Sequence, residues 1–271
     1  WSRIVATQAV MRFPFNVRPL LKVPKSENPK GLALWVMALL DSYQTFDQAS
    51  YRVEAERLLE RLLCLRSPGH WSGDCWGYQY PWQDLGFFAP KATPNAVVTA
   101  FVCESFLQAF HVTGDTRWLA PVRSAMGFFL NDLQVLWDTP EELCLGYMPL
   151  PMKMRVMDVS ILIASVVAAL AAIDGDESLR HVALRLTRYV MRRQTVEGAW
   201  YYTEPPEDSP VRIDNYHTGF ILDALQRVMA RLEMEEWREP HYRGAIFYAR
   251  HLFNADGSPR WMSDRDYPHD I

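Results

Sequence analysis

Hydrophobic residues follow two alternating patterns along the chain. Four stretches are apolar on nearly every side, and each is followed, after a short turn, by a stretch with hydrophobic residues on one face only. In one of the latter, from Val122 to Leu133, the hydrophobic positions follow the i, i+3, i+4, i+7 spacing of a single helix face. The pattern therefore predicts four helical hairpins, each with a buried first helix and a second helix that has one face in water.

Turns and connectors divide these hairpins into repeats. Short turns such as 113–115 and 174–176 join the two helices, and each hairpin closes on a connector rich in glycine and aromatic residues. Units of such even length indicate a repeat protein with two concentric helical layers, either an open solenoid or a closed ring. The helices are expected at 31–43 and 51–65, 96–112 and 118–133, 157–172 and 179–193, and 217–232 and 241–253.

The composition is that of an ordinary globular chain. Its 271 residues are 49% hydrophobic and 22% charged, which is enough to build a sizeable core in a single domain over residues 1–271. Within it, residues 1–28 are expected to form a helix end and a proline-rich crossing, and residues 29–271 the four hairpins. A net charge of −4 without a basic block argues against nucleic acid as a partner, because nucleic acid binding needs a positive surface.

Neither a membrane span nor a disulfide framework is expected. The longest apolar run, 159–173, is shorter than the ~20 residues needed to span a bilayer, so it predicts a buried core helix. The four cysteines have neither CxxC spacing nor a tight framework. Free thiols in a reducing compartment are therefore expected, together with a cytoplasmic location.

The connector at 71–95 combines aromatic rings with carboxylates. Such a combination is typical of a cavity wall, although a long connection folded back over the core would look similar. Asp74 and Asp84 are candidates for the acid or base of a catalytic reaction. The aromatic rings can stack on a sugar ring or shield a carbocation. The predicted platform consists of Trp71, Trp76, Tyr78, Trp82 and Gln83.

A second constellation lies at 212–220, where the fourth hairpin begins. Asp214 can cap the helix or take part in catalysis. Tyr216 and His217 then fall in the first turn, where a histidine can exchange a proton near neutral pH and a tyrosine can donate one. The repeats resemble those of the α/α-toroid proteins, in which the inner helices and their incoming connectors start at one end of the ring. This resemblance implies that Trp200 and Tyr202 also lie at that end.

Basic residues before the inner helices are candidates for binding an anionic substrate. Arg155 precedes the third inner helix and Arg212 the fourth, and arginine pairs carboxylates with two hydrogen bonds. Ordinary surface charge is the alternative for both. No nucleotide-binding glycine motif, HExxH zinc motif or GxSxG motif occurs in the sequence, so neither a cofactor nor a metal site is predicted.

The apolar first helices, the Thr-Gly-Asp turn at 113–115 and the Gly/Trp/Tyr connectors resemble the α/α-toroid proteins over residues 29–265. These include the six-hairpin glycosidases, polysaccharide lyases, uronyl epimerases and terpenoid cyclases. The resemblance implies an all-α fold, an α/α toroid, and an enzyme that acts on a glycan, in particular one with uronates, by hydrolysis, elimination or epimerisation. A terpenoid-cyclase-like enzyme with one aspartate as proton donor and a non-catalytic glycan-binding scaffold are the alternatives, although the DxDD motif of squalene-type cyclases is missing.

The chain shows fewer hairpins than the six of the six-hairpin glycosidases. Its last residues, 267–271, read like the start of another inner helix. We therefore expect the sequence to be part of a longer protein or a ring left open.

Overall fold

The structure is a computed structural model that describes residues 5–6, 9–10, 12–83, 87–208 and 211–269. All four predicted hairpins occur in the described part of the chain. Their helices are α2 Pro29–Phe46, α3 Ala49–Cys64, α4 Ala96–Thr113, α5 Leu119–Gly127, α6 Met157–Asp174, α7 Glu177–Met191, α8 Asn215–Leu232 and α9 Arg238–His251, with short helical turns at Thr116–Trp118, Phe128–Asp132 and Pro206–Asp208.

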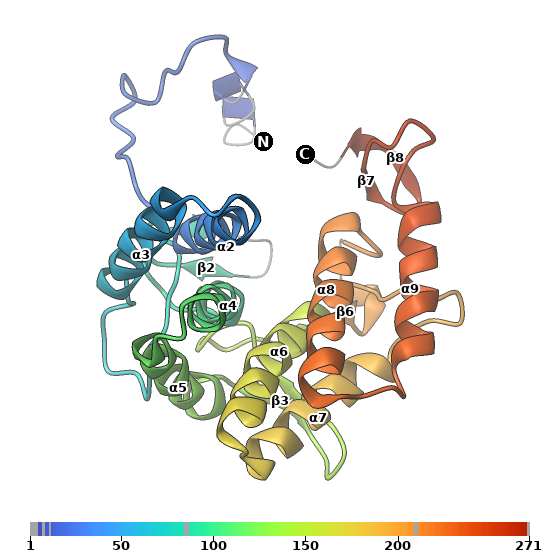
Figure 1. Cartoon of the computed structure of the whole chain (residues 1–271). Helices are drawn as coiled ribbons and strands as arrows, with labels where there is room; N and C mark the ends of the chain where they lie inside the picture. Colours follow the sequence, from blue (N-terminus) through green and yellow to red (C-terminus); the bar gives the residue numbers. More distant parts are fainter. Residues whose placement is uncertain (1–4, 7–8, 11, 84–86, 209–210, 270–271) are drawn as a thin grey trace.

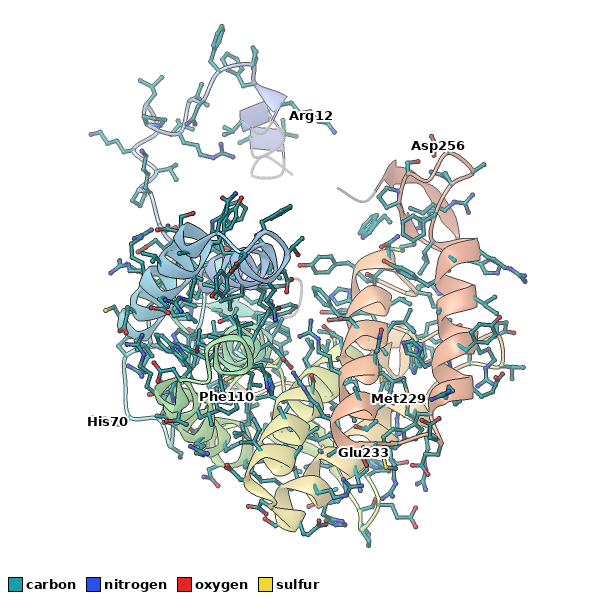
Figure 2. The ribbon with its side chains drawn as sticks, in the orientation of Figure 1. Arg12, His70, Phe110, Met229, Glu233 and Asp256 are labelled. Carbon is teal, nitrogen blue, oxygen red and sulfur yellow. The ribbon has the colours of Figure 1, made fainter. Side chains whose placement is uncertain are left out.

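The helices lie in two layers along an arc (Figure 1). The helices α2, α4, α6 and α8 contact each other in that order and form the inner layer, while α3, α5, α7 and α9 each pack on the helix before them. Figure 2, in the same orientation, shows side chains packed between the helices of the arc. The prediction of helical hairpins in two layers is confirmed, with helix bounds shifted by a few residues.

Burial differs between the inner helices. The helix α6 has inner neighbours on both sides, and its residues from Met157 to Ala171 are all buried. The helix α2 lies at one end of the arc, where Leu34 and Trp35 are 45% and 60% exposed. The expectation that every first helix is buried on all sides is wrong for α2 and α8, because among the described helices each has an inner neighbour on one side only, α4 for α2 and α6 for α8.

Two inner helices, α4 and α6, are long and apolar enough to cross a membrane by length and composition. In this fold, 72% of the apolar window of α4 and 83% of that of α6 is buried inside the protein. Burial of this extent is what the core helices of a globular protein show. The prediction of a buried core helix at 159–173 is therefore confirmed.

The connectors form small two-stranded antiparallel sheets. The last of these sheets shows that one prediction was wrong. Residues 267–271 were expected to begin a helix, whereas residues 265–269 form a strand. The turn after Met262 places Arg265 opposite Met262. The following residues then pair back along the preceding strand, so that His269 lies opposite Arg260. The strand pairs are β1 Trp82–Gln83 with β2 Phe88–Ala89, β3 Val135–Asp138 with β4 Leu143–Leu145, β5 Arg155–Val156 with β6 Thr203–Glu204, and β7 Arg260–Met262 with β8 Arg265–His269.

The connectors also hold the starts of two inner helices. The backbone N–H of Ala96, the first residue of α4, donates to the carbonyl of Tyr147 (2.8 Å). In the same way Met157, the first residue of α6, donates to the carbonyl of Tyr202 (2.9 Å). First-turn N–H groups have no partner within their own helix, so these bonds satisfy them. The two tyrosines that close the second and third repeats are thereby fixed beside the first turns of the inner helices.

Candidate functional site

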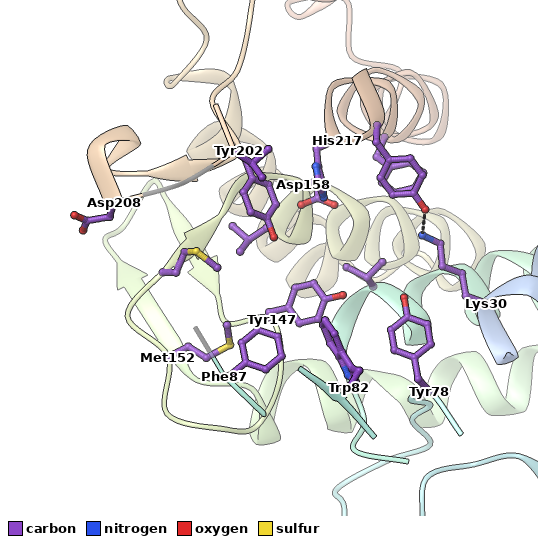
Figure 3. Close-up of a pocket in the computed structure, with 16 residues that line it drawn as sticks. Lys30, Tyr78, Trp82, Phe87, Tyr147, Met152, Asp158, Tyr202, Asp208 and His217 are labelled. Atoms are coloured by element: carbon purple, nitrogen blue, oxygen red, sulfur yellow. Dashed lines mark hydrogen bonds between the residues drawn. The ribbon is translucent and has the colours of Figure 1, made fainter. Parts of the chain in front are cut away.

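A cavity of about 440 Å³ lies at the N-terminal ends of the inner helices (Figure 3). The second residue of every inner helix lines it: Lys30 of α2, Val97 of α4, Asp158 of α6 and Tyr216 of α8. Helix N-termini carry a positive partial charge, so four of them around one cavity favour a negatively charged ligand. The other lining residues are Tyr78, Trp82, Phe87, Tyr147, Met152, Met154, Val156, Tyr202, Asp208, Val211, His217 and Phe220.

His217 is held by Asp214, the residue that caps α8. One carboxylate oxygen of Asp214 accepts the backbone N–H of His217 at 2.9 Å, and both oxygens lie 2.9 Å from Nδ1 of the ring. This arrangement places the hydrogen on Nδ1, so Nε2 is the nitrogen left to exchange a proton. Burial works to lower the pKa of His217, but Asp158 and Asp214 together outweigh burial and raise it.

Asp158 is a buried carboxyl group in the wall of the cavity. Its side chain is 2% exposed, and its Oδ1 has no hydrogen-bond partner among the described residues. Burial raises the pKa of Asp158, with a further contribution from Asp214, against the opposing effects of His217 and Lys30. Buried polar atoms are normally hydrogen-bonded, so the unpartnered Oδ1 of this cavity-lining residue is an exception that core packing does not explain.

Lys30 lies in the wall beside Tyr216 and is 6% exposed. Its Nζ donates to the hydroxyl of Tyr216 (2.8 Å), the dashed line in Figure 3, and lies 4.4 to 4.9 Å from the ring centres of Phe101, Tyr216 and Phe220. Burial lowers the pKa of Lys30 to about 8, although Asp158 partly counteracts this effect. The ammonium group is therefore charged at neutral pH, but the surrounding protein compensates its positive charge only weakly.

Aromatic rings form the wall opposite these ionisable groups (Figure 3). The ring of Trp82 meets Tyr78 at 5.6 Å, Phe87 at 4.8 Å and Tyr147 at 6.1 Å between centres. Burial raises the pKa of Tyr78 to about 12, and that of Tyr147 well above its usual range, so both hydroxyls stay protonated near neutral pH. The wall thus offers flat apolar surface together with neutral hydroxyl groups.

Several residues singled out from the sequence come together in this cavity. Tyr78, Trp82, Tyr202, Tyr216 and His217 line it, although they come from three different repeats. The ring of Tyr202 lies 4.2 Å from that of His217. Asp214 lies behind His217, where it both caps the helix, as expected, and binds the ring.

Two of the predicted tryptophans lie in the core instead. Trp76 is fully buried and its Nε1 donates to the carbonyl of Leu62 in α3 (2.7 Å), while the buried Trp200 donates to Val190 in α7 (3.0 Å). Each indole therefore anchors its connector to the preceding outer helix. In both connectors the tyrosine two residues later, Tyr78 or Tyr202, reaches the cavity.

The remaining candidates lie outside the cavity lining. Trp71 donates to the carbonyl of Pro68 and packs its ring edge on Phe128, and Asp74 forms an ion pair with Arg66 (2.8 Å). Each of these side chains thus has a structural partner.

The two predicted arginines have partners of the same kind. Arg155 lies 3.7 Å from Glu204 and over the ring of Trp137, and the exposed Arg212 lies over Tyr201. Asp84 and the side chain of Gln83 lie outside the part of the chain that the structure describes.

Sequence reasoning missed Lys30 and Asp158 and did not assign a role to Tyr147. The signal is present in the sequence, because Tyr216 stands out by its place in the first turn of an inner helix. The same position in the other repeats is occupied by Lys30, Val97 and Asp158. Selecting the first-turn residue of every inner helix, and not of α8 alone, would have found both charged residues.

No protein-family model and no curated protein matches the sequence. Solved structures match its shape. A sugar epimerase from a ruminal bacterium has a TM-score of 0.68 at 12% identity, over 90% of this chain and 67% of that one. An unsaturated glucuronyl hydrolase specific for heparin has a TM-score of 0.62 at 12% identity, over 87% and 60%. A GH76 alpha-mannanase from Bacteroides thetaiotaomicron has a TM-score of 0.64 at 11% identity, over 86% and 63%.

These similarities establish the fold of the chain. The matched structures are α/α toroids, so the predicted all-α class and toroid architecture are confirmed. The chain covers between 60% and 67% of the length of the three structures named.

Proposed function

We propose that this α/α-toroid protein is a carbohydrate-active enzyme that transfers protons to and from a sugar ring bound in the cavity, on a glycan that contains uronates. The observation that carries the proposal is the pairing of His217, backed by Asp214, with the buried carboxyl group of Asp158. These two groups lie on one side of the cavity, and aromatic rings suited to stacking on a sugar lie on the other (Figure 3).

His217 and Asp158 have the properties of a general acid and a general base. The pKa of each is raised, and each contributes to the shift of the other, so they titrate as a pair. With one proton shared between them, one group accepts a proton from the substrate while the other donates one. Hydrolysis, elimination and epimerisation all need such a pair at a sugar ring.

Among these reactions the cavity favours elimination or epimerisation. Hydrolysis by two carboxyl groups requires them to lie about 5 to 9.5 Å apart on either side of the glycosidic bond. Asp214 is engaged by His217, and Asp208 lies at the far end of the cavity from Lys30, so the described lining places no second carboxylate beside Asp158 (Figure 3). A histidine with one carboxyl group is instead suited to removing and returning a proton at a ring carbon.

Size and charge also support a sugar over a polyene. A cavity of about 440 Å³ falls within the range of about 300–1,000 Å³ that is usual for small-molecule sites. A terpenoid cyclase stabilises a carbocation, which the ammonium of Lys30 and a protonated His217 would repel. The same positive groups, together with four helix N-termini, attract the carboxylate of a uronate.

Proton exchange in D₂O tests the proposal for elimination and epimerisation, the two reactions that the cavity favours. Hydrolysis removes no proton from a ring carbon and is followed instead by the new reducing ends that it releases. The protein is incubated with acidic oligosaccharides, and NMR follows deuterium entering a ring carbon or the loss of that carbon's proton. We expect exchange with the wild type and a loss of about a hundredfold or more in Asp158→Asn and His217→Asn.

Asp74→Asn is the matched control, since Asp74 pairs with Arg66 away from the cavity. It should keep wild-type exchange. The proposal fails if acidic sugars neither exchange a ring-carbon proton nor are cleaved, or if Asp74→Asn loses as much activity as Asp158→Asn. Binding without any product would support the glycan-binding scaffold instead.

A further inference from the structure

Among the described residues, the buried Lys30 differs from the half-buried Arg193 and Arg231 in lacking a carboxylate partner. Arg231 contacts Glu104 at 2.7 Å, and Arg193 contacts both Glu142 and Glu204. By contrast, no carboxylate oxygen of the described residues lies within 4.0 Å of Nζ of Lys30, which contacts a phenol hydroxyl and three ring faces. Lysine is almost never buried without a partner, because desolvating an ammonium group is costly.

We propose that Lys30 recognises the carboxylate of a free uronic acid residue and thereby sets the specificity of the cavity for acidic over neutral or esterified sugars. This inference rests on the proposed function and names the residue that recognises the negative charge of the substrate. An ammonium group has three N–H donors, and the hydroxyl of Tyr216 takes one of them. Two donors and the full positive charge then remain for a ligand.

The position of Lys30 fits this role. It lines the same cavity as Asp158 and His217, and Figure 3 shows it at the end of the cavity where Tyr78 lies. Lys30 and Asp158 are near enough for each to shift the pKa of the other. A ring whose carboxylate binds Lys30 therefore presents its neighbouring carbons to the proton-transfer pair.

The surroundings of Nζ explain why the ligand must carry a negative charge. Phe101, Tyr216 and Phe220 exclude water from Nζ and offer only weak electrostatic compensation through their ring faces. A carboxylate supplies the missing counter-charge and forms a charge-assisted hydrogen bond. A methyl ester or a neutral hexose fills the same space but leaves the ammonium group uncompensated.

Calorimetric binding of three matched ligands tests this inference. The ligands are a uronic acid oligosaccharide, its methyl ester and the corresponding neutral hexose oligosaccharide, and the proteins are the wild type, Lys30→Met and Lys91→Met. For the wild type we expect the free acid to bind about tenfold to a hundredfold more tightly than the ester. Lys30→Met should bind the acid and the ester equally, at the wild-type affinity for the ester.

Lys91→Met is the control for loss of one positive charge, since Lys91 is exposed in a turn outside the cavity lining. It should keep the wild-type preference. Thermal unfolding of Lys30→Met checks the fold, and its midpoint should not fall, because the substitution removes a buried charge without a partner.

Two results would overturn the role of Lys30 and leave the proposed function in place. The wild type could bind acid and ester equally, or Lys30→Met could weaken both by the same factor. Failure of the wild type to bind any of the three sugars would overturn both the inference and the proposed function.

Discussion

The inner helices carry two clusters of buried charge that differ in one respect. In the body of the inner layer, Glu104 of α4, Ser165 of α6 and Arg231 of α8 are joined by hydrogen bonds of 2.6 to 2.7 Å. At the N-terminal end of the same helices, Lys30, Asp158 and His217 line a cavity, and Asp158 Oδ1 has no hydrogen-bond partner among the described residues. The charges in the body of the inner layer are thus paired within the protein. Lys30 and Asp158 at the cavity have no ion-pair partner within 4.0 Å among the described residues.

The pKa values of two buried carboxyl groups express this difference. Burial alone would raise the pKa of Glu104, but the charge and hydrogen bonds of Arg231 lower it to about 2. Asp158 is buried to a similar degree, and burial together with the charge of Asp214 raises its pKa against the opposing effects of His217 and Lys30. The partner, and not the burial, decides which protonation state the fold favours.

The largest effect is expected from breaking the paired cluster. Arg231→Met leaves the carboxylate of Glu104 buried without its main partner, and we expect a loss of about 3–5 kcal/mol in the free energy of unfolding. Urea denaturation measures this loss. Arg227→Met is the control, since Arg227 lies farther from Glu104, at 3.3 Å, and is 31% exposed, so its loss should be smaller. Equal losses in the two variants would show that Arg231 is not the main partner.

A smaller effect is expected from Asp214→Asn, which tests the backing of His217. The amide oxygen can still cap α8, so stability should change little. The negative charge that helps to raise the pKa of His217 is lost, so activity should fall about a hundredfold and the limb of the pH–rate profile that belongs to His217 should move to lower pH.

The matched control for this variant is Asp176→Asn, which changes the cap of α7 at a distance from the cavity. It should leave both the rate and the profile unchanged. An unshifted profile in Asp214→Asn would show that Asp214 acts only as a cap.

The contrast between the two clusters also shows what the sequence can predict. The hairpins were predictable because hydrophobic periodicity is local. Tyr78 and Tyr202 were also predictable, because glycine- and aromatic-rich connectors recur between the repeats. The pairing of Glu104 with Arg231 joins residues 127 positions apart and leaves no local pattern. The sequence also could not separate Trp76 from Tyr78, because the choice depends on the carbonyl of Leu62, which binds the indole and fixes it in the core.

Charged residues within apolar helices were the second feature that the sequence alone did not identify as part of a site. In the sequence Asp158 stands only as the flank of a hydrophobic run, and Lys30 as part of a helix start. Their importance comes from the arc, which brings the first turns of α2, α6 and α8 to one cavity. Once the toroid is known, position in the first turn is a better guide to the site than residue type.

The sharpest contrast of sign is expected from neutralising each buried carboxyl group, and Asp158→Asn should give the smallest effect of all the variants apart from the controls. The raised pKa of Asp158 in the folded state means that its contribution to stability is full below the unfolded pKa of 3.8 and is lost as pH rises through the folded pKa. Asp158→Asn should therefore be more stable than the wild type at about pH 7, by about 1 kcal/mol, and this gain should shrink as pH falls.

Glu104→Gln should behave in the opposite way. The pKa of Glu104 is lowered to about 2 in the folded state, so its contribution is present above the unfolded pKa of 4.5 and is lost as pH falls toward 2. This variant should be less stable than the wild type at neutral pH and approach it in acid. Urea denaturation of both variants at several pH values gives the two curves. If both variants were more stable than the wild type at neutral pH, or both less stable, the two clusters would not differ in how their charge is compensated.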